Sequence, residues 1–219
     1  MSEPNVVDWT VRELFAPIQI VPGLSVCLND VAPPEDGSAV IFIDRGESFG
    51  TGGHPATQAI IWQFITVFKW VTPENEHLLN GKRLLEYNCG TGVLSLIAHC
   101  FLPMLEIVAV ADAPDQDIAS RNVSANGAEN KIAVRSMNSF RTQNARKRNK
   151  GTFDYVLTQS ADPAVGLMAS MMKSGATLLY GGHNAQIHHA MKNRILEFLK
   201  VVDVNDMVGW PVIQAEKTK

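Results

Sequence analysis

The hydrophobic positions of this chain fall into short and longer runs that alternate from residue 39 to the end. Short apolar runs between turn residues predict strands, and longer runs flanked by proline or glycine predict helices. We expect helices at 56–70, 91–101, 114–127, 163–175 (ended by Gly175) and 184–200. We expect strands at 39–44, 82–88, 105–112, 131–137, 153–159 and 176–182, and two more within 201–217. This alternation predicts an α/β fold with a mostly parallel sheet covered on both faces.

The first part of the chain is less regular than the rest. The sequence FAPIQIVPGLSVCLND at 15–30 predicts short strands broken by proline and glycine, and VAPPEDGS at 31–38 is a turn-rich connector. We therefore expect an N-terminal extension at residues 1–38 and a larger domain at residues 39–219.

Composition and charge narrow the class of protein. The chain has 219 residues, 46% of them hydrophobic, which is enough for one substantial core. Its formal net charge of -3 argues against a general nucleic-acid binder, because such proteins neutralise phosphates with cations. The basic run at 141–150 is expected to be a solvated loop, and its role stays open.

Other composition signals are negative. The apolar runs are too short for a membrane span and no secretory signal is visible, so we expect a soluble, cytoplasmic protein. The three cysteines lack CxxC spacing, which argues against a disulfide framework or a structural zinc site. No metal site is expected at His183, His188 and His189, since carboxylate or thiolate partners at ligand spacing are missing.

A glycine-containing turn, EYNCGTG at 86–92, joins an expected strand to an expected helix. Gly90 and Gly92 allow backbone to approach a ligand closely, and the helix start offers free N–H groups. The spacing is neither the GxGxxG of dinucleotide-binding proteins nor a phosphate-binding P-loop. A tight turn with a purely structural role is the alternative.

Asp112 ends the next strand, twenty residues after Gly92. A carboxylate at this place can accept hydrogen bonds from both hydroxyls of a ribose. It can instead cap the helix that follows, where Pro114 marks the first turn. The turn and the spaced acid together favour a ligand that contains adenosine.

The segments EYNCGTGVLSL, VAVADAPDQDIASRNVSANG and GTFDYVLTQ resemble class I S-adenosylmethionine-dependent methyltransferases. The stretch ESFGTGGHPAT at 47–57 resembles the FGTGxHxTT signature of the PrmA type, which methylates lysines of a ribosomal large-subunit protein. GWPVIQAEK near the end is similar to that family's last strand. The resemblance covers about 13–217 and implies a three-layer Rossmann-like fold, a seven-stranded sheet with an antiparallel last strand, and S-adenosylmethionine as cofactor.

The resemblance also implies site residues. Gln159 falls where the family has an asparagine after its fourth strand, and would orient the acceptor amine as the catalytic residue. His54 in the signature either holds the loop against the sheet or touches substrate. Cys89 is expected to contribute backbone contacts rather than act as a nucleophile. The expected cofactor-binding residues are Thr57, Asn88, Cys89, Gly90, Gly92, Asp112 and Ser139.

Two positions depart from the family pattern, Asn88 in place of its first turn glycine and Gln159 in place of its asparagine. Asparagine tolerates left-handed backbone, so the turn can survive, although the side chain would crowd the methionine end of the cofactor or hydrogen-bond its carboxylate. The family's N-terminal substrate-recruiting domain is expected to be absent. We predict an N-methyltransferase acting on a protein amine, ribosomal or other. The alternatives are a degenerate, non-enzymatic scaffold and a small-molecule amine methyltransferase.

Overall fold

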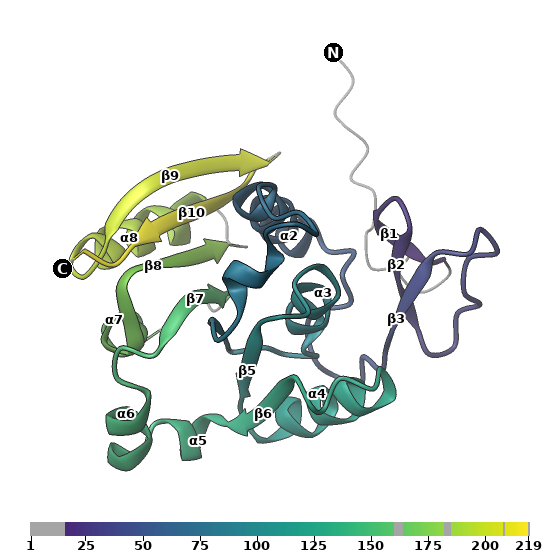
Figure 1. Cartoon of the computed structure of the whole chain (residues 1–219), viewed down its shortest axis with the longest axis horizontal. Helices are drawn as coiled ribbons and strands as arrows, with labels where there is room; N and C mark the ends of the chain where they lie inside the picture. The colour runs from purple at the N-terminus through teal and green to yellow at the C-terminus, as the bar shows by residue number, and fades with distance from the viewer. Residues whose placement is uncertain (1–15, 160–163, 182–184, 208, 219) are drawn as a thin grey trace.

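The computed structural model describes residues 16–159, 164–181, 185–207 and 209–218. Its strands form two sheets (Figure 1). The smaller contains β1 (Ile18–Val21), β2 (Leu24–Leu28) and β3 (Ala39–Ile43). The larger contains β4 (Arg83–Tyr87), β5 (Glu106–Ala111), β6 (Ile132–Ser136), β7 (Phe153–Thr158), β8 (Met172–Gly181), β9 (Lys200–Met207) and β10 (Trp210–Glu216).

The seven-stranded sheet has the order β6-β5-β4-β7-β8-β10-β9. Strands β4 to β8 pair in parallel, and β10 pairs antiparallel with both β8 and β9. The chain leaves β4 toward β5 and β6, then returns to place β7 on the other side of β4. Strand order therefore reverses between β4 and β7, and the expected Rossmann-like sheet with its antiparallel last strand is confirmed.

Helices cover both faces of this sheet. Adjacent Leu84 and Leu85 of β4 belong to two separate apolar clusters, because successive side chains of a strand point to opposite faces. One cluster includes buried residues of α2 (Pro55–Phe68), α3 (Val93–Phe101) and α4 (Ala113–Ala125). The other includes residues of α5 (Met137–Phe140), α7 (Val165–Met171) and α8 (Ala185–Leu196). None of the helices in the described ranges could cross a membrane.

The expected helix at 163–175 is wrong in its last four residues. Helix α7 ends at Met171, and β8 begins at once with Met172, which pairs with Phe153. Gly175 lies inside β8 with φ +77, where the β7–β8 register shifts. The Gly175 amide donates to the carbonyl of Lys217 at 2.8 Å. Pairing across the sheet overrode the helical spacing of the methionines.

The expected basic loop at 141–150 is also wrong, because it contains helix α6 (Gln143–Asn149). Thr142 caps this helix by accepting a hydrogen bond from the amide of Ala145 at 3.2 Å. Ala145 is buried, whereas the basic side chains are exposed. A short 3₁₀-helix, η1 (Glu76–Leu79), was not expected either.

The small sheet is joined to the large domain through two asparagines one turn apart, Asn122 in α4 and Asn126 just after its end. The Asn126 side chain accepts from the Phe42 amide at 2.9 Å and donates to the Phe42 carbonyl at 2.7 Å. Asn122 does the same with Asp44, at 2.7 and 3.0 Å. Strand β3 also pairs in parallel with β2, so hydrogen bonds connect the two sides of the proposed boundary at residue 38. The division into two domains stays a prediction.

Candidate functional site

The carboxyl ends of β4 and β7 meet where strand order reverses, and ligands of open α/β sheets bind at such points. Asn88 follows β4, and Gln159 follows β7. The start of α2 also reaches this place, because the Thr57 hydroxyl donates to the Gln159 side-chain oxygen at 3.5 Å. The structure thus brings together three residues that are far apart in the chain.

The turn after β4 is left-handed at three positions, with φ +65 at Asn88, +53 at Gly90 and +80 at Gly92. Asn88 is the one non-glycine residue with positive φ in the described part of the chain, and its side chain is exposed. The turn geometry therefore survives the replacement of glycine by asparagine, as its tolerance of this backbone region predicts.

The signature loop at 47–57 packs directly on this turn. A Cβ atom at Gly90 would lie 2.3 Å from the carbonyl oxygen of Phe49. The same carbonyl accepts from the Thr91 amide at 3.2 Å, and the Thr91 hydroxyl donates to the carbonyl of Gly50. The Ser48 hydroxyl fastens the loop to α4 through Asp115, at 2.5 Å. Glycine is therefore needed at position 90 for the packing of the loop, because the Phe49 carbonyl occupies the space that a side chain would fill.

His54 connects the loop to α2 and to the last strand. Its Nδ1 accepts from the amide of Ala56 at 3.2 Å, which caps α2. Its ring contacts Phe49 and Trp210 edge-on, with centroids 5.0 Å apart in both pairs. Burial lowers the pKa of His54 below its ordinary value of 6.5, so the ring is neutral at pH 7. His54 thus holds the loop in place, and Phe49, 53% exposed, extends the aromatic row into solvent.

Asp112 precedes α4 with an exposed side chain. Among the described residues this side chain makes no capping hydrogen bond, although the Asp112 carbonyl accepts from the Gln116 amide at 2.8 Å. The carboxylate therefore does not cap the helix, which was one of the two interpretations, and the side chain is exposed just after the end of β5. Ser139 is exposed in α5, and its hydroxyl donates to the carbonyl of Ser136 at 2.9 Å.

Sequence reasoning missed Glu86, a fully buried residue of β4 two positions before Asn88. Its carboxyl accepts from the Ser95 amide at 2.9 Å and from the Ser95 hydroxyl. Gly92, at the N-cap of α3, has no side chain for capping, so Glu86 supplies the cap from the neighbouring strand. A single acid inside the apolar run RLLEY was the signal available in the sequence.

Burial decides the ionisation of this group. Desolvation raises the pKa of Glu86 from 4.5 to about 7, against the lowering effect of the hydrogen bonds from Ser95. Burial likewise raises the pKa of the neighbouring Cys89 thiol well above 9.0, so this cysteine has no thiolate character at neutral pH. Within the described residues no group of three or more His, Cys, Asp or Glu side chains could hold a metal ion.

Comparison with known proteins adds the family. The family model described as "Ribosomal protein L11 methyltransferase (PrmA)" matches residues 2–218. The ribosomal protein L11 methyltransferase of Ralstonia pickettii is 30% identical over 189 residues, which cover 83% of this chain and 56% of that protein. That of Caldanaerobacter subterraneus subsp. tengcongensis is 25% identical over 99% of this chain and 67% of its own length.

A solved structure agrees in fold. The ribosomal protein L11 methylase of Lactobacillus delbrueckii subsp. bulgaricus superposes with a TM-score of 0.70 at 15% identity, over 93% of this chain and 99% of that one. The chain spans about half the length of the first curated relatives it matches, 56% for the Ralstonia proteins. Because the family model matches nearly all of its residues, this chain belongs to the ribosomal protein L11 methyltransferase (PrmA) family.

Proposed function

We propose that this chain transfers a methyl group from S-adenosylmethionine to an amine nitrogen of a protein. The observation that carries the proposal is the packing of the FGTGGHPAT loop on the left-handed turn at 88–92, beside the exposed carboxylate of Asp112. Family membership supports the same reaction, and the names of the relatives support a ribosomal protein as acceptor. A ribosomal acceptor would place the reaction in the cytoplasm.

The residues of the turn fit this cofactor. Backbone at Gly90 and Gly92 can approach a ligand closely, and Asp112 offers two acceptor oxygens for ribose hydroxyls. Thr57 at the start of α2, the exposed Asn88 side chain and the backbone of Cys89 would hold the methionine end, and Ser139 would lie near the adenine. When bound, the cofactor supplies a sulfonium methyl carbon that is already electrophilic.

The chain's own residues would position the acceptor. The Gln159 carboxamide oxygen can accept a hydrogen bond from an amine and so orient its lone pair, while the Thr57 hydroxyl restrains the carboxamide. Phe49 and the neutral ring of His54 provide an apolar approach that does not repel a cationic side chain. A strong general base is not required if the amine arrives deprotonated, since these groups need only exclude water and hold the two reactants close.

Calorimetry with S-adenosylmethionine tests the cofactor assignment. Asp112→Ala removes two hydrogen bonds to a charged group, each worth about 1.5–3 kcal/mol, so the affinity should fall at least about tenfold. Asp117→Ala on the exposed face of α4 is the matched control and should bind like wild type. Absence of binding by the wild-type chain at millimolar cofactor would refute the assignment.

Methyl transfer from labelled cofactor tests the reaction. The wild-type chain should label a protein of the ribosomal large subunit, and Gln159→Leu should abolish labelling while cofactor affinity stays unchanged. Labelling of small amines alone would identify a small-molecule methyltransferase. Cofactor binding without labelling of either class would identify a scaffold. Asn88→Gly, which keeps the left-handed turn, should then raise cofactor affinity if the Asn88 side chain blocks the methionine end.

A further inference from the structure

A groove of about 620 Å³ lies on the face of β5 and β6 beside α5 and α6, and of the residues proposed to hold the cofactor only Ser139 lines it. Those two helices have only four and seven residues, too short to cover the strands fully. Val108 and Ala133 on this face of the sheet are therefore only half-buried. This is a larger hollow than the 270 Å³ one beside the signature loop.

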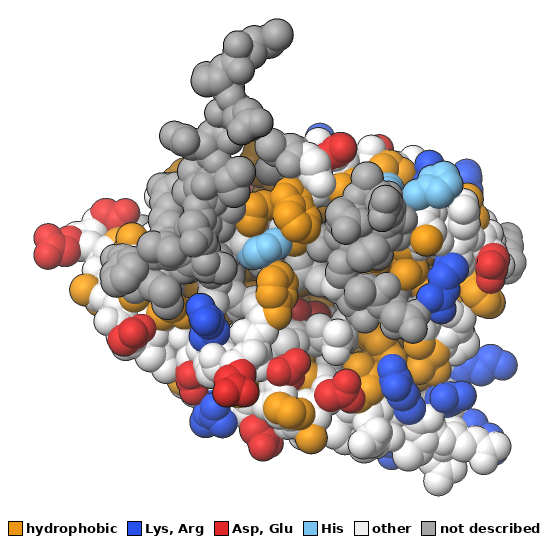
Figure 2. Space-filling model, turned by 180° about the vertical axis from the view of Figure 1, so that it is seen from behind, with side chains coloured by type: hydrophobic (Ala, Val, Ile, Leu, Met, Phe, Trp, Pro, Cys, Tyr) orange, Lys and Arg blue, Asp and Glu red, His pale blue; other side chains and the backbone are white. Residues whose placement is uncertain are grey.

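The chain around this groove is strongly basic. Seven of its 19 Lys and Arg residues lie between residues 131 and 150, and that segment contains no Asp or Glu. All seven are exposed, and none forms an ion pair among the described residues. Figure 2 shows Lys and Arg side chains gathered at the lower right, which is where the turned view brings α6 from its place at the lower left of Figure 1. The seven residues are Lys131, Arg135, Arg141, Arg146, Lys147, Arg148 and Lys150.

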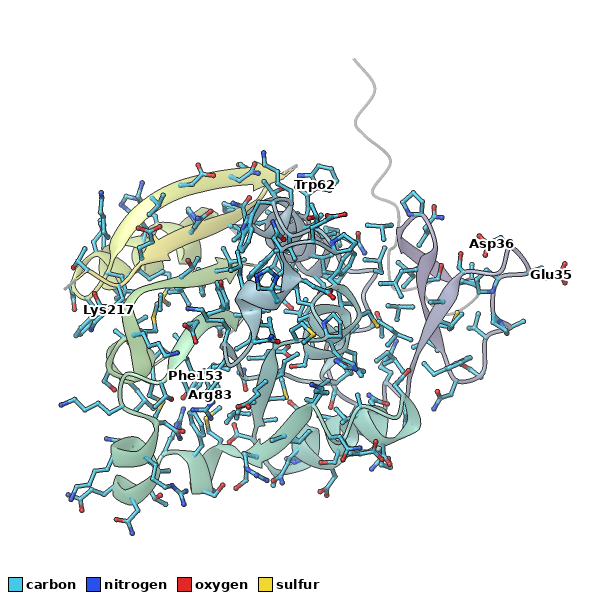
Figure 3. All side chains as sticks on the ribbon, in the orientation of Figure 1. Glu35, Asp36, Trp62, Arg83, Phe153 and Lys217 are labelled. Atoms are coloured by element: carbon cyan, nitrogen blue, oxygen red, sulfur yellow. The ribbon has the colours of Figure 1, made fainter. Side chains whose placement is uncertain are left out.

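The two acidic side chains that line the groove already have partners within the chain. Glu106 lies 3.8 Å from Arg83, and Glu129 accepts from the Ser124 hydroxyl at 2.7 Å. Arg83 is held as well, with its guanidinium 4.6 Å from the ring centre of Phe153 (Figure 3). Arg135 and Arg148 also line the groove, and neither forms an ion pair with a carboxylate in the described part of the chain. The net charge of -3 of the whole chain therefore hides a locally positive surface around residues 131–150.

We propose that helix α6 and this groove bind the phosphate backbone of single-stranded RNA. Four of the seven cations are arginines, whose planar forks match phosphate oxygens in pairs. Asn130 and Asn149 in the groove offer donors and acceptors to 2′-hydroxyls. A hollow on a sheet face between exposed cations is a surface that a flexible single strand can follow with its phosphates.

An acidic peptide fits this surface less well. Protein interfaces are depleted of charged side chains at their centre and depend on apolar anchors. Here the apolar lining is mostly used inside the fold, because Ile107, Phe140 and Ala145 are already buried. Nucleic-acid interfaces are far more positively charged than protein interfaces, as this one is.

Fluorescence anisotropy with a labelled oligouridine tests the proposal without cofactor, so the result does not depend on methyl transfer. Wild type should bind with a Kd on the order of 1–100 μM, and binding should weaken steeply with salt. The triple change Arg146→Ala, Lys147→Ala and Arg148→Ala preserves helix propensity while it removes three cations. It should weaken binding at least about tenfold and reduce the slope of log K against log salt by about 2.

The matched control removes three cations elsewhere, Lys69→Ala, Lys192→Ala and Lys200→Ala, and should bind like wild type. Equal weakening by both triples would overturn the proposal, because it would show an effect of net charge alone. Tighter binding of polyglutamate or of duplex RNA than of oligouridine would overturn it too, as would absence of wild-type binding at low salt. Unchanged melting temperatures verify that both triple variants are folded.

Discussion

The buried carboxyl of Glu86 makes a quantitative prediction about stability. Its pKa is about 7 in the folded chain against 4.5 in the unfolded chain. Between these values the folded state binds a proton that the unfolded state has released, so the free energy of unfolding must fall as pH rises. From pH 5 to pH 8 the loss contributed by this one group is about 2–3 kcal/mol, since each pKa unit corresponds to 1.36 kcal/mol.

Glu86→Gln removes the ionisation and keeps an oxygen that can accept from the Ser95 amide. We expect the variant to gain about 2–3 kcal/mol relative to wild type between pH 5 and pH 8. Urea denaturation at four pH values in this range measures the difference. Glu47→Gln is the control, because Glu47 is exposed and its replacement should leave the pH dependence unchanged.

Two outcomes would refute the reasoning. A difference between wild type and Glu86→Gln that does not change with pH would mean that the carboxyl is not buried in its neutral form. A wild-type chain that gains stability through this group as pH rises would mean that the start of α3 stabilises the anion by more than burial destabilises it.

Three further predictions concern contacts that hold the site together. Gly90→Ala should destabilise the chain by about 2 kcal/mol or more because its Cβ meets the Phe49 carbonyl, whereas Gly127→Ala, equally left-handed but with open space, should cost about 1 kcal/mol in urea denaturation. Asn122→Ala breaks the bonds to Asp44, so the Asp44 amide should exchange hydrogen markedly faster by NMR. Burial raises the pKa of Asp154, but hydrogen bonds from Lys173, Arg83 and Lys82 outweigh it and hold the pKa below 3.8. Wild type should therefore lose more stability than Asp154→Asn as pH falls through about 4, a sign opposite to that of Glu86, measurable by thermal unfolding.

Most strands and helices were predictable from the sequence because each carries its own local pattern, whereas the seven-stranded sheet with its antiparallel last strand was implied by the family resemblance. The left-handed backbone at Asn88 was predictable for the same reason, since it depends on the residue itself. The start of β8 at Met172 was not, because the methionine spacing is helical and only pairing with Phe153 decides otherwise.

The contacts that shape the site could not be predicted, because they join distant residues. Nothing near Asn122 in the sequence indicates that its amide bonds Asp44, 78 residues away, and the carbonyl of Thr91. The docking of Phe49 on Gly90 is equally non-local. The sequence analysis interpreted the glycines as space for a ligand. At Gly90 the Phe49 carbonyl of the chain itself occupies that space.

The carboxyl of Glu86 affects which nucleotides the turn at 88–92 can accept. Dinucleotide-binding proteins leave the amides at the corresponding helix start free to receive pyrophosphate. In this chain the Ser95 amide is already taken by Glu86, and the Thr91 amide by the Phe49 carbonyl. A phosphate at these two amides would have to compete with the buried Glu86 carboxyl and with the Phe49 carbonyl. We therefore expect the turn at 88–92 to disfavour phosphorylated nucleosides, because a carboxyl of the chain already accepts the hydrogen bond that a phosphate would take.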